Sequence, residues 1–91
     1  MQQHCTITVS GLVQGVAFRY STRGKARELG LSGFVRNERD GTVLIEAEGE
    51  EGAIRQLIEW CKNGPTHAQV DDVKAMWGDA QGRYQDFVIE R

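Results

Sequence analysis

The sequence predicts a single α+β domain over residues 1–91, in which an antiparallel sheet carries two helices on one face. Three observations lead to this fold class. A chain of 91 residues has room for one core and no second domain. Several segments alternate apolar and polar residues as half-buried strands do, and two others have the periodicity of helices.

The first half of the sequence predicts the order strand, helix, strand. Residues 5–10 alternate over a β-branched run, with Cys5, Ile7 and Val9 facing the core. The loop 11–17 leads into a helix at about 18–29, in which Tyr20, Ala26 and Leu29 share one side and Gly30 provides the stop. Residues 33–37 form the second strand.

The second half of the sequence predicts strand, helix, strand and a short terminal strand. Asp40-Gly41 is a dipeptide typical of hairpin turns and precedes a strand at 42–48. The helix at about 51–62 places apolar residues at i, i+3, i+4 and i+7, and Gly64-Pro65 ends it. Strands at 70–77 and 87–89 follow. The resulting β-α-β-β-α-β order is the split βαβ, or ferredoxin-like, pattern.

Composition excludes several classes of function. The chain has 11 Lys and Arg against 13 Asp and Glu, a net charge of −2, which argues against nucleic-acid partners. No stretch approaches the ~20 apolar residues of a membrane helix, and the N-terminus has no signal pattern, so we expect a cytoplasmic monomer with no membrane partner. Cys5 and Cys61 lie too far apart in this topology for a disulfide, which predicts two free thiols.

The loop between the first strand and the first helix carries the chemical signal. Gly11 and Gly15 bracket Gln14, and Arg19 lies in the first turn of the helix. Glycine lets successive backbone N–H groups point into one concavity, and the helix N-terminus adds its own free N–H groups. The Arg19 guanidinium can grip two oxygens of a phosphoryl group. Since the Walker pattern is absent, the loop predicts an anion site without implying a nucleotide.

Two long motifs resemble the signatures of the acylphosphatase family. Residues 11–19, GLVQGVAFR, look like the pattern G-x-V-Q-G-V-x-[FY]-R. Residues 33–43, GFVRNERDGTV, look like G-[FYW]-[AVC]-[KR]-N-x-x-[DE]-G-x-V. Later segments also fit, so the resemblance runs from about residue 5 to residue 89. Leu12 stands where a basic residue is common in the family, and Ala17 stands where glycine is frequent.

The resemblance implies hydrolysis of the carboxyl–phosphate bond of small acyl phosphates, without a metal or other cofactor. It assigns Asn37 to orient the attacking water and Arg19 to bind the phosphoryl group. It also assigns phosphate binding to the backbone N–H groups of the loop, which are those of Gly15, Val16, Ala17, Phe18 and Arg19. In the ferredoxin-like order, the first two strands run parallel, which brings Asn37 beside Arg19.

Two other functions remain as alternatives. A non-catalytic domain that binds an anion or carbamoyl phosphate would keep the same loop. An RNA-binding module shares the element order, but strand 42–48 has two acidic residues and no aromatic platform. Glu46, Glu48, Glu50 and Glu51 are interpreted as a solvated acidic face rather than a metal site, since no histidine is expected among them.

Overall fold

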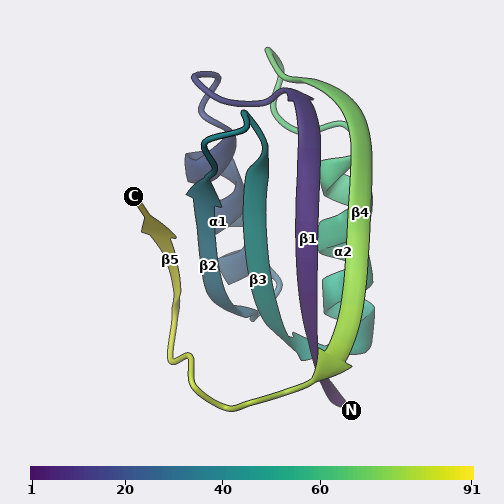
Figure 1. Ribbon diagram of the computed structural model, residues 1–91. Helices are drawn as coiled ribbons and strands as arrows, with labels where there is room; N and C mark the ends of the chain where they lie inside the picture. The colour runs from purple at the N-terminus through teal and green to yellow at the C-terminus, as the bar shows by residue number, and fades with distance from the viewer.

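The computed structural model describes all of residues 1–91 and contains seven regular elements (Figure 1). In chain order they are β1 (Gln2–Leu12), α1 (Phe18–Glu28), β2 (Ser32–Asn37), β3 (Val43–Glu50), α2 (Glu51–Cys61), β4 (Gln69–Asp79) and β5 (Phe87–Glu90). Every predicted element is present. The observed strand that most exceeds its predicted length is β1. It begins three residues before the predicted strand, because its first residues continue the ladder with β3.

The five strands form one sheet in the order β4-β1-β3-β2-β5. β3 runs antiparallel to both β1 and β2, so β1 and β2 run parallel to each other, as expected. β5 pairs with β2 in parallel, which makes the sheet mixed rather than wholly antiparallel. The cause is the connection 80–86, which crosses from β4 at one edge of the sheet to β5 at the other (Figure 1).

Both helices cover the same face of the sheet (Figure 1), and the core lies between them and the strands. Cys5, Ile7 and Val9 are fully buried there, as their alternation predicts. The buried residues of α1 are Phe18, Thr22 and Ala26, which repeat every four residues. The expectation that Tyr20 lies on this side is wrong: it is 67% exposed, because it is rotated by about 200° around the helix from Phe18.

The open face of the sheet carries a polar cluster that corrects the interpretation of the acidic run. His4 lies opposite Glu48 in the β1–β3 ladder, and its imidazole bonds to Glu48 at 2.7 Å and to Glu46 at 2.5 Å. Glu48 is only 4% exposed and also accepts the backbone N–H groups of Gln81 and Gly82. A histidine therefore joins the acidic residues, and Glu48 holds the 80–86 connection against the sheet.

Hydrogen bonds decide the protonation of this cluster. Burial alone would lower the pKa of His4, but its hydrogen bonds to Glu48 and Glu46 outweigh burial and raise the pKa. Burial would raise the pKa of Glu48, but the N–H groups of Gln81 and Gly82, together with His4, lower it. His4 and Glu48 therefore stabilise each other's charged forms.

Both cysteines are buried and free, which confirms the prediction of two thiols. Burial raises the pKa of Cys61 to about 12. Burial also raises the pKa of Cys5 to about 11. Neither helix is long and apolar enough to cross a bilayer.

Candidate active site

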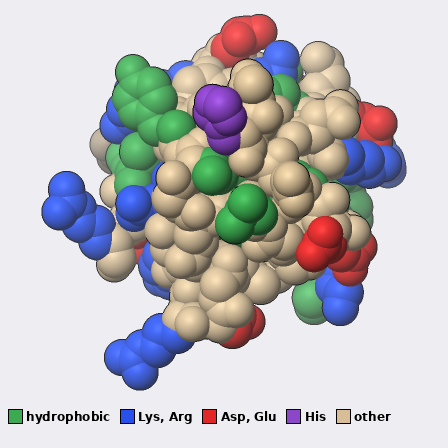
Figure 2. All heavy atoms as spheres, turned by 90° about the horizontal axis from the view of Figure 1, so that it is seen from above, with side chains coloured by type: hydrophobic (Ala, Val, Ile, Leu, Met, Phe, Trp, Pro, Cys, Tyr) green, Lys and Arg blue, Asp and Glu red, His purple; other side chains and the backbone are tan.

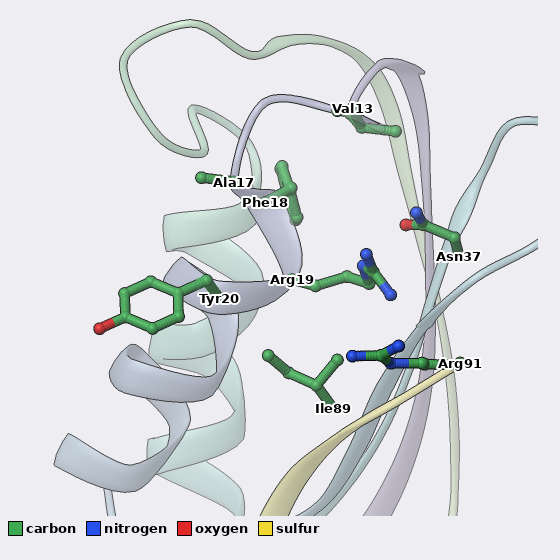
Figure 3. Close-up of a pocket in the computed structure, with 9 residues that line it drawn as sticks. Val13, Ala17, Phe18, Arg19, Tyr20, Asn37, Ile89 and Arg91 are labelled. Atoms are coloured by element: carbon green, nitrogen blue, oxygen red, sulfur yellow. The ribbon is translucent and has the colours of Figure 1, made fainter.

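Three parts of the chain meet at the end of the sheet where β1 and β2 finish (Figure 1). The loop 13–17 leaves β1 and enters α1, Asn37 is the last residue of β2, and the chain after β5 runs alongside. A cavity of about 630 Å³ opens between them. The structure therefore brings Arg19 and Asn37 to one pocket, although they lie far apart in the sequence (Figure 3).

A glycine and a register shift turn the chain out of the sheet into the loop. The pairing of β1 with β4 shifts between Ser10 and Gly11. Gly11 has φ +123°, and a Cβ there would lie 2.2 Å from the carbonyl oxygen of Gln69. A residue with a side chain cannot take this position without moving β4. This is a close backbone approach that only glycine permits.

The loop itself contains two left-handed residues. Gly15 has φ +75°, and Ala17 has φ 62° and ψ 21°. Ala17 is the N-cap of α1 and the only non-glycine residue with positive φ in the chain. The left-handed turns curl the backbone, and no side chain caps the helix start. The first backbone bond into the helix runs from Ser21 N–H to Ala17 O at 3.0 Å, which leaves the preceding N–H groups for a ligand.

Gln14 ties this loop to the turn that follows Asn37. Its Nε2 donates to the carbonyl oxygens of Glu38 at 2.8 Å and Thr42 at 2.9 Å. The turn is closed by Asp40, whose carboxylate accepts the N–H and the hydroxyl of Thr42. Gln14 thus fixes the distance between the two halves of the site. The sequence marks Gln14 only by its position in the first motif. Its two hydrogen-bond partners lie 24 and 28 residues further along the chain, so this restraint has no local signal.

The start of α1 is anchored from the opposite side of the loop. The ring of Phe18 is buried and lies 5.6 Å from the ring of Trp60, between centroids. Gly64, at φ +66°, approaches the same ring so closely that a Cβ would lie 2.7 Å from it. The segment after α2 therefore holds Phe18, and with it the first turn of α1, in place.

Most of the predicted site residues line the pocket. They are Gly15, Ala17, Phe18, Arg19 and Asn37, and the remaining lining residues are Val13, Tyr20, Ile89 and Arg91. Val16 does not line it, because its side chain packs against the core. Sequence reasoning missed Ile89 and Arg91, whose presence depends on the parallel pairing of β5 with β2, for which the sequence has no local signal.

The amide oxygen of Asn37 is the unusual polar atom of the site. It is buried and has no hydrogen-bond partner in the protein. Buried polar atoms are normally paired, because leaving one unpaired costs about 1–3 kcal/mol. Figure 3 shows the Asn37 amide, which extends from the sheet, and the Arg19 guanidinium, which extends from α1, pointing toward one another. The oxygen is therefore available to accept a hydrogen bond from a molecule in the pocket.

The site is electropositive although the chain is acidic overall. Arg19 and Arg91 line the pocket, and no Asp or Glu does. Figure 2 shows this end of the molecule from above, with Lys and Arg side chains around most of its margin and Asp and Glu side chains among them at the upper and right margins. Free backbone N–H groups, a helix N-terminus and guanidinium groups together suit a small anion.

Comparison with known proteins points to one family. The family profile described as acylphosphatase matches residues 5–89. The acylphosphatase of Marinobacter nauticus is 53% identical over 81 residues, which is 89% of this chain and 88% of that protein. The crystal structure of acylphosphatase from Bacillus subtilis superposes with a TM-score of 0.93 at 37% identity and full coverage of both chains. Full-length HypF, in a phosphate- and nucleotide-bound form, contains a similar unit (TM-score 0.91, 33% identity), which is 12% of that chain.

Proposed function

Because the chain belongs to the acylphosphatase family, we propose that this pocket hydrolyses acyl phosphates to a carboxylate and inorganic phosphate. The observation that carries the proposal is the unpaired, buried Oδ1 of Asn37 beside Arg19 in an anion-binding pocket. An anion cradle alone would bind phosphate. An additional acceptor for a water O–H makes it a hydrolytic site.

The phosphoryl group binds in the curl of the loop. The backbone N–H groups of residues 15–19 donate to its oxygens, and the Arg19 guanidinium donates to two of them. These donors are already held in place by Gln14 and by the packing of Phe18. Charge that develops on the phosphoryl oxygens in the transition state is then stabilised without reorganisation of the protein.

Asn37 positions the attacking water. Its Oδ1 accepts one water O–H, which directs a lone pair of the water oxygen toward phosphorus. The new P–O bond forms while the bond from phosphorus to the acyl oxygen breaks, and the carboxylate leaves with that electron pair. The water proton passes to an oxygen of the phosphate. An amide is no general base, so the role of Asn37 is orientation.

The leaving group explains why so few side chains are needed. A carboxylate has a pKa near 4, so it leaves without protonation. Phosphoryl transfer proceeds through a loose transition state, in which positioning and charge stabilisation supply most of the rate. The pocket is lined by no Asp, Glu, His or Cys. The proposed reaction accordingly uses no protein acid or base, and we propose that it needs no metal ion.

The test is the hydrolysis of benzoyl phosphate in the presence of EDTA. We expect activity in the parent protein, inhibition by inorganic phosphate as a competitor, and a loss of about 10²–10³-fold in kcat/KM in Arg19→Ala and in Asn37→Ala. Asn63→Ala and Arg83→Ala change the same residue types outside the pocket and should retain activity. Full turnover in both Arg19→Ala and Asn37→Ala would overturn the proposal.

The similarity to part of HypF favours one alternative, a domain that binds an anion or carbamoyl phosphate without turnover. The same experiment separates the two functions. Phosphate binding measured by calorimetry, without hydrolysis of benzoyl phosphate, would favour the alternative. We further propose that the protein is a cytoplasmic monomer, for which light scattering after gel filtration tests the oligomeric state.

A further inference from the structure

The pocket contains a second guanidinium that phosphoryl binding does not use. The last ladder pair between β5 and β2 is Glu90 with Arg36, and an ion pair at 3.5 Å joins their side chains. Arg91 follows directly and therefore comes level with Asn37, the next residue of β2. Figure 3 shows the Arg91 side chain reaching into the pocket beside Arg19, from a different element.

This guanidinium has no protein counter-ion. Arg19 and Arg91 form no ion pair with a carboxylate, as is also true of Arg23, Arg39 and Arg83. Arg19 and Arg91 differ from those three in lining one pocket together. No acidic side chain lines the pocket that Arg19 and Arg91 share. Two like charges face one hollow, which favours a ligand with negative charge at two places.

The size of the pocket agrees with a ligand larger than phosphate. Its volume of about 630 Å³ lies in the range of about 300–1,000 Å³ typical of pockets that hold a whole small molecule. Inorganic phosphate has only five non-hydrogen atoms. Val13 and Ile89 supply apolar surface for the rest of the substrate, whereas the Tyr20 ring points away from Arg19 and Arg91 (Figure 3). The acyl group therefore has a place within the pocket, with Arg91 on its border.

We propose that Arg91 binds a carboxylate on the acyl portion of the substrate, so that acyl phosphates with a second anionic group are preferred over those with a neutral acyl group. The proposal rests on the proposed function, in which Arg19 and the loop already hold the phosphoryl group. A planar guanidinium matches a carboxylate through two parallel N–H···O bonds. The contacted group does not change during the reaction, so the preference is expressed in KM rather than in kcat.

The experiment compares benzoyl phosphate with its analogue that carries a carboxylate at the meta position of the ring. The quantity measured is kcat/KM for the carboxylated substrate divided by kcat/KM for benzoyl phosphate. Effects on the phosphoryl end, which both substrates share, cancel in this ratio. We expect Arg91→Gln to lower the ratio about fivefold, as for a partly exposed ion pair. Arg91→Lys should restore part of it, because the charge returns without the planar fork. Arg83→Gln, with the same loss of charge on the open face of the sheet, should leave the ratio unchanged.

Three results would overturn this assignment. An unchanged ratio in Arg91→Gln would show that Arg91 does not contact the acyl group. An equal fall in kcat/KM for both substrates, with weaker phosphate inhibition, would place Arg91 on the phosphoryl group instead. An equal fall of the ratio in Arg83→Gln would show an effect of net charge alone. Absence of benzoyl phosphate turnover in the parent protein is a separate outcome, since it contradicts the proposed function itself.

Discussion

Ala17 stores backbone strain in the loop that we propose binds phosphate, and replacing it by glycine should release that strain. It is the only non-glycine residue with positive φ, at φ 62° and ψ 21°. An L-residue in this conformation costs roughly 1–2 kcal/mol, because its Cβ approaches the following carbonyl oxygen. The Ala17→Gly substitution removes that cost and leaves the φ angle accessible.

The expected gain is smaller than the strain. Glycine has more freedom in the unfolded chain, which costs about 0.4–1 kcal/mol on folding. The Ala17 side chain is exposed, so little packing is lost with its methyl group. The net result is a stabilisation of roughly 0.5–1 kcal/mol, or about 4 °C in Tm for a domain of this size. The curl of the loop persists, so turnover of benzoyl phosphate should stay close to that of the parent protein.

Urea denaturation followed by circular dichroism measures this change in the free energy of unfolding. Ala75→Gly is the matched control, because Ala75 is also exposed but lies within β4. Glycine within a strand costs roughly 0.5–1 kcal/mol relative to alanine, so the two substitutions should have opposite signs. If Ala17→Gly destabilised the protein as much as Ala75→Gly does, Ala17 would not carry the strain that its φ angle indicates.

Other substitutions and a thiol titration test the fold. Gly33→Ala places a Cβ 1.8 Å from the carbonyl oxygen of Glu46 at φ +136°, so we expect the free energy of unfolding, measured in urea, to fall by about 3 kcal/mol or more. Gly24 lies inside α1 with open space around it, so Gly24→Ala should raise the free energy of unfolding by about 1 kcal/mol. The pKa of His4 is raised in the folded protein despite its burial. The stabilisation that protonated His4 gives is therefore complete below its pKa in the unfolded chain and is lost as pH rises through its pKa in the folded protein. The parent protein should exceed His4→Gln in free energy of unfolding at low pH, and this difference should shrink over that interval. Burial raises the pKa of Cys61 to about 12, so a thiol reagent at neutral pH should react with it only after unfolding, when two thiols are titrated per chain.

The fold was predictable where the signal is local. Alternation identified the strands, and the apolar spacing in 51–62 correctly placed Ile54, Leu57 and Cys61 in the core. The error at Tyr20 arose because α1 has few large apolar residues, and its buried stripe includes the polar Thr22. The parallel pairing of β5 could not be predicted, since it depends on a long crossing connection rather than on residues within the strand.

The candidate site divides in the same way. Gly15 and Arg19 lie in one sequence motif and Asn37 lies in another, each an unbroken stretch of chain. The parallel arrangement of β1 and β2 brings the two motifs together. The restraint by Gln14 requires two carbonyl groups in a distant turn, and the position of Arg91 requires the register of β5 on β2. Such contacts follow from the sheet as a whole, and no pattern within either segment encodes them.

The net charge of −2 misleads about anion binding because it ignores where the charges lie. Val43 pairs with Asn37 at the pocket end of β3, whereas Glu50 pairs with Gln2 at the other end. Glu50 lies seven residue steps along the strand from Val43, about 23 Å at the usual rise per residue. Dissolved salt screens the field of an exposed charge over about 8 Å at physiological ionic strength. At the pocket end, Glu38 and Glu90 both pair with Arg36, and no carboxylate side chain lines the pocket. The local field there therefore comes from Arg19, Arg91 and the free N–H groups of the loop, which formal charge does not count.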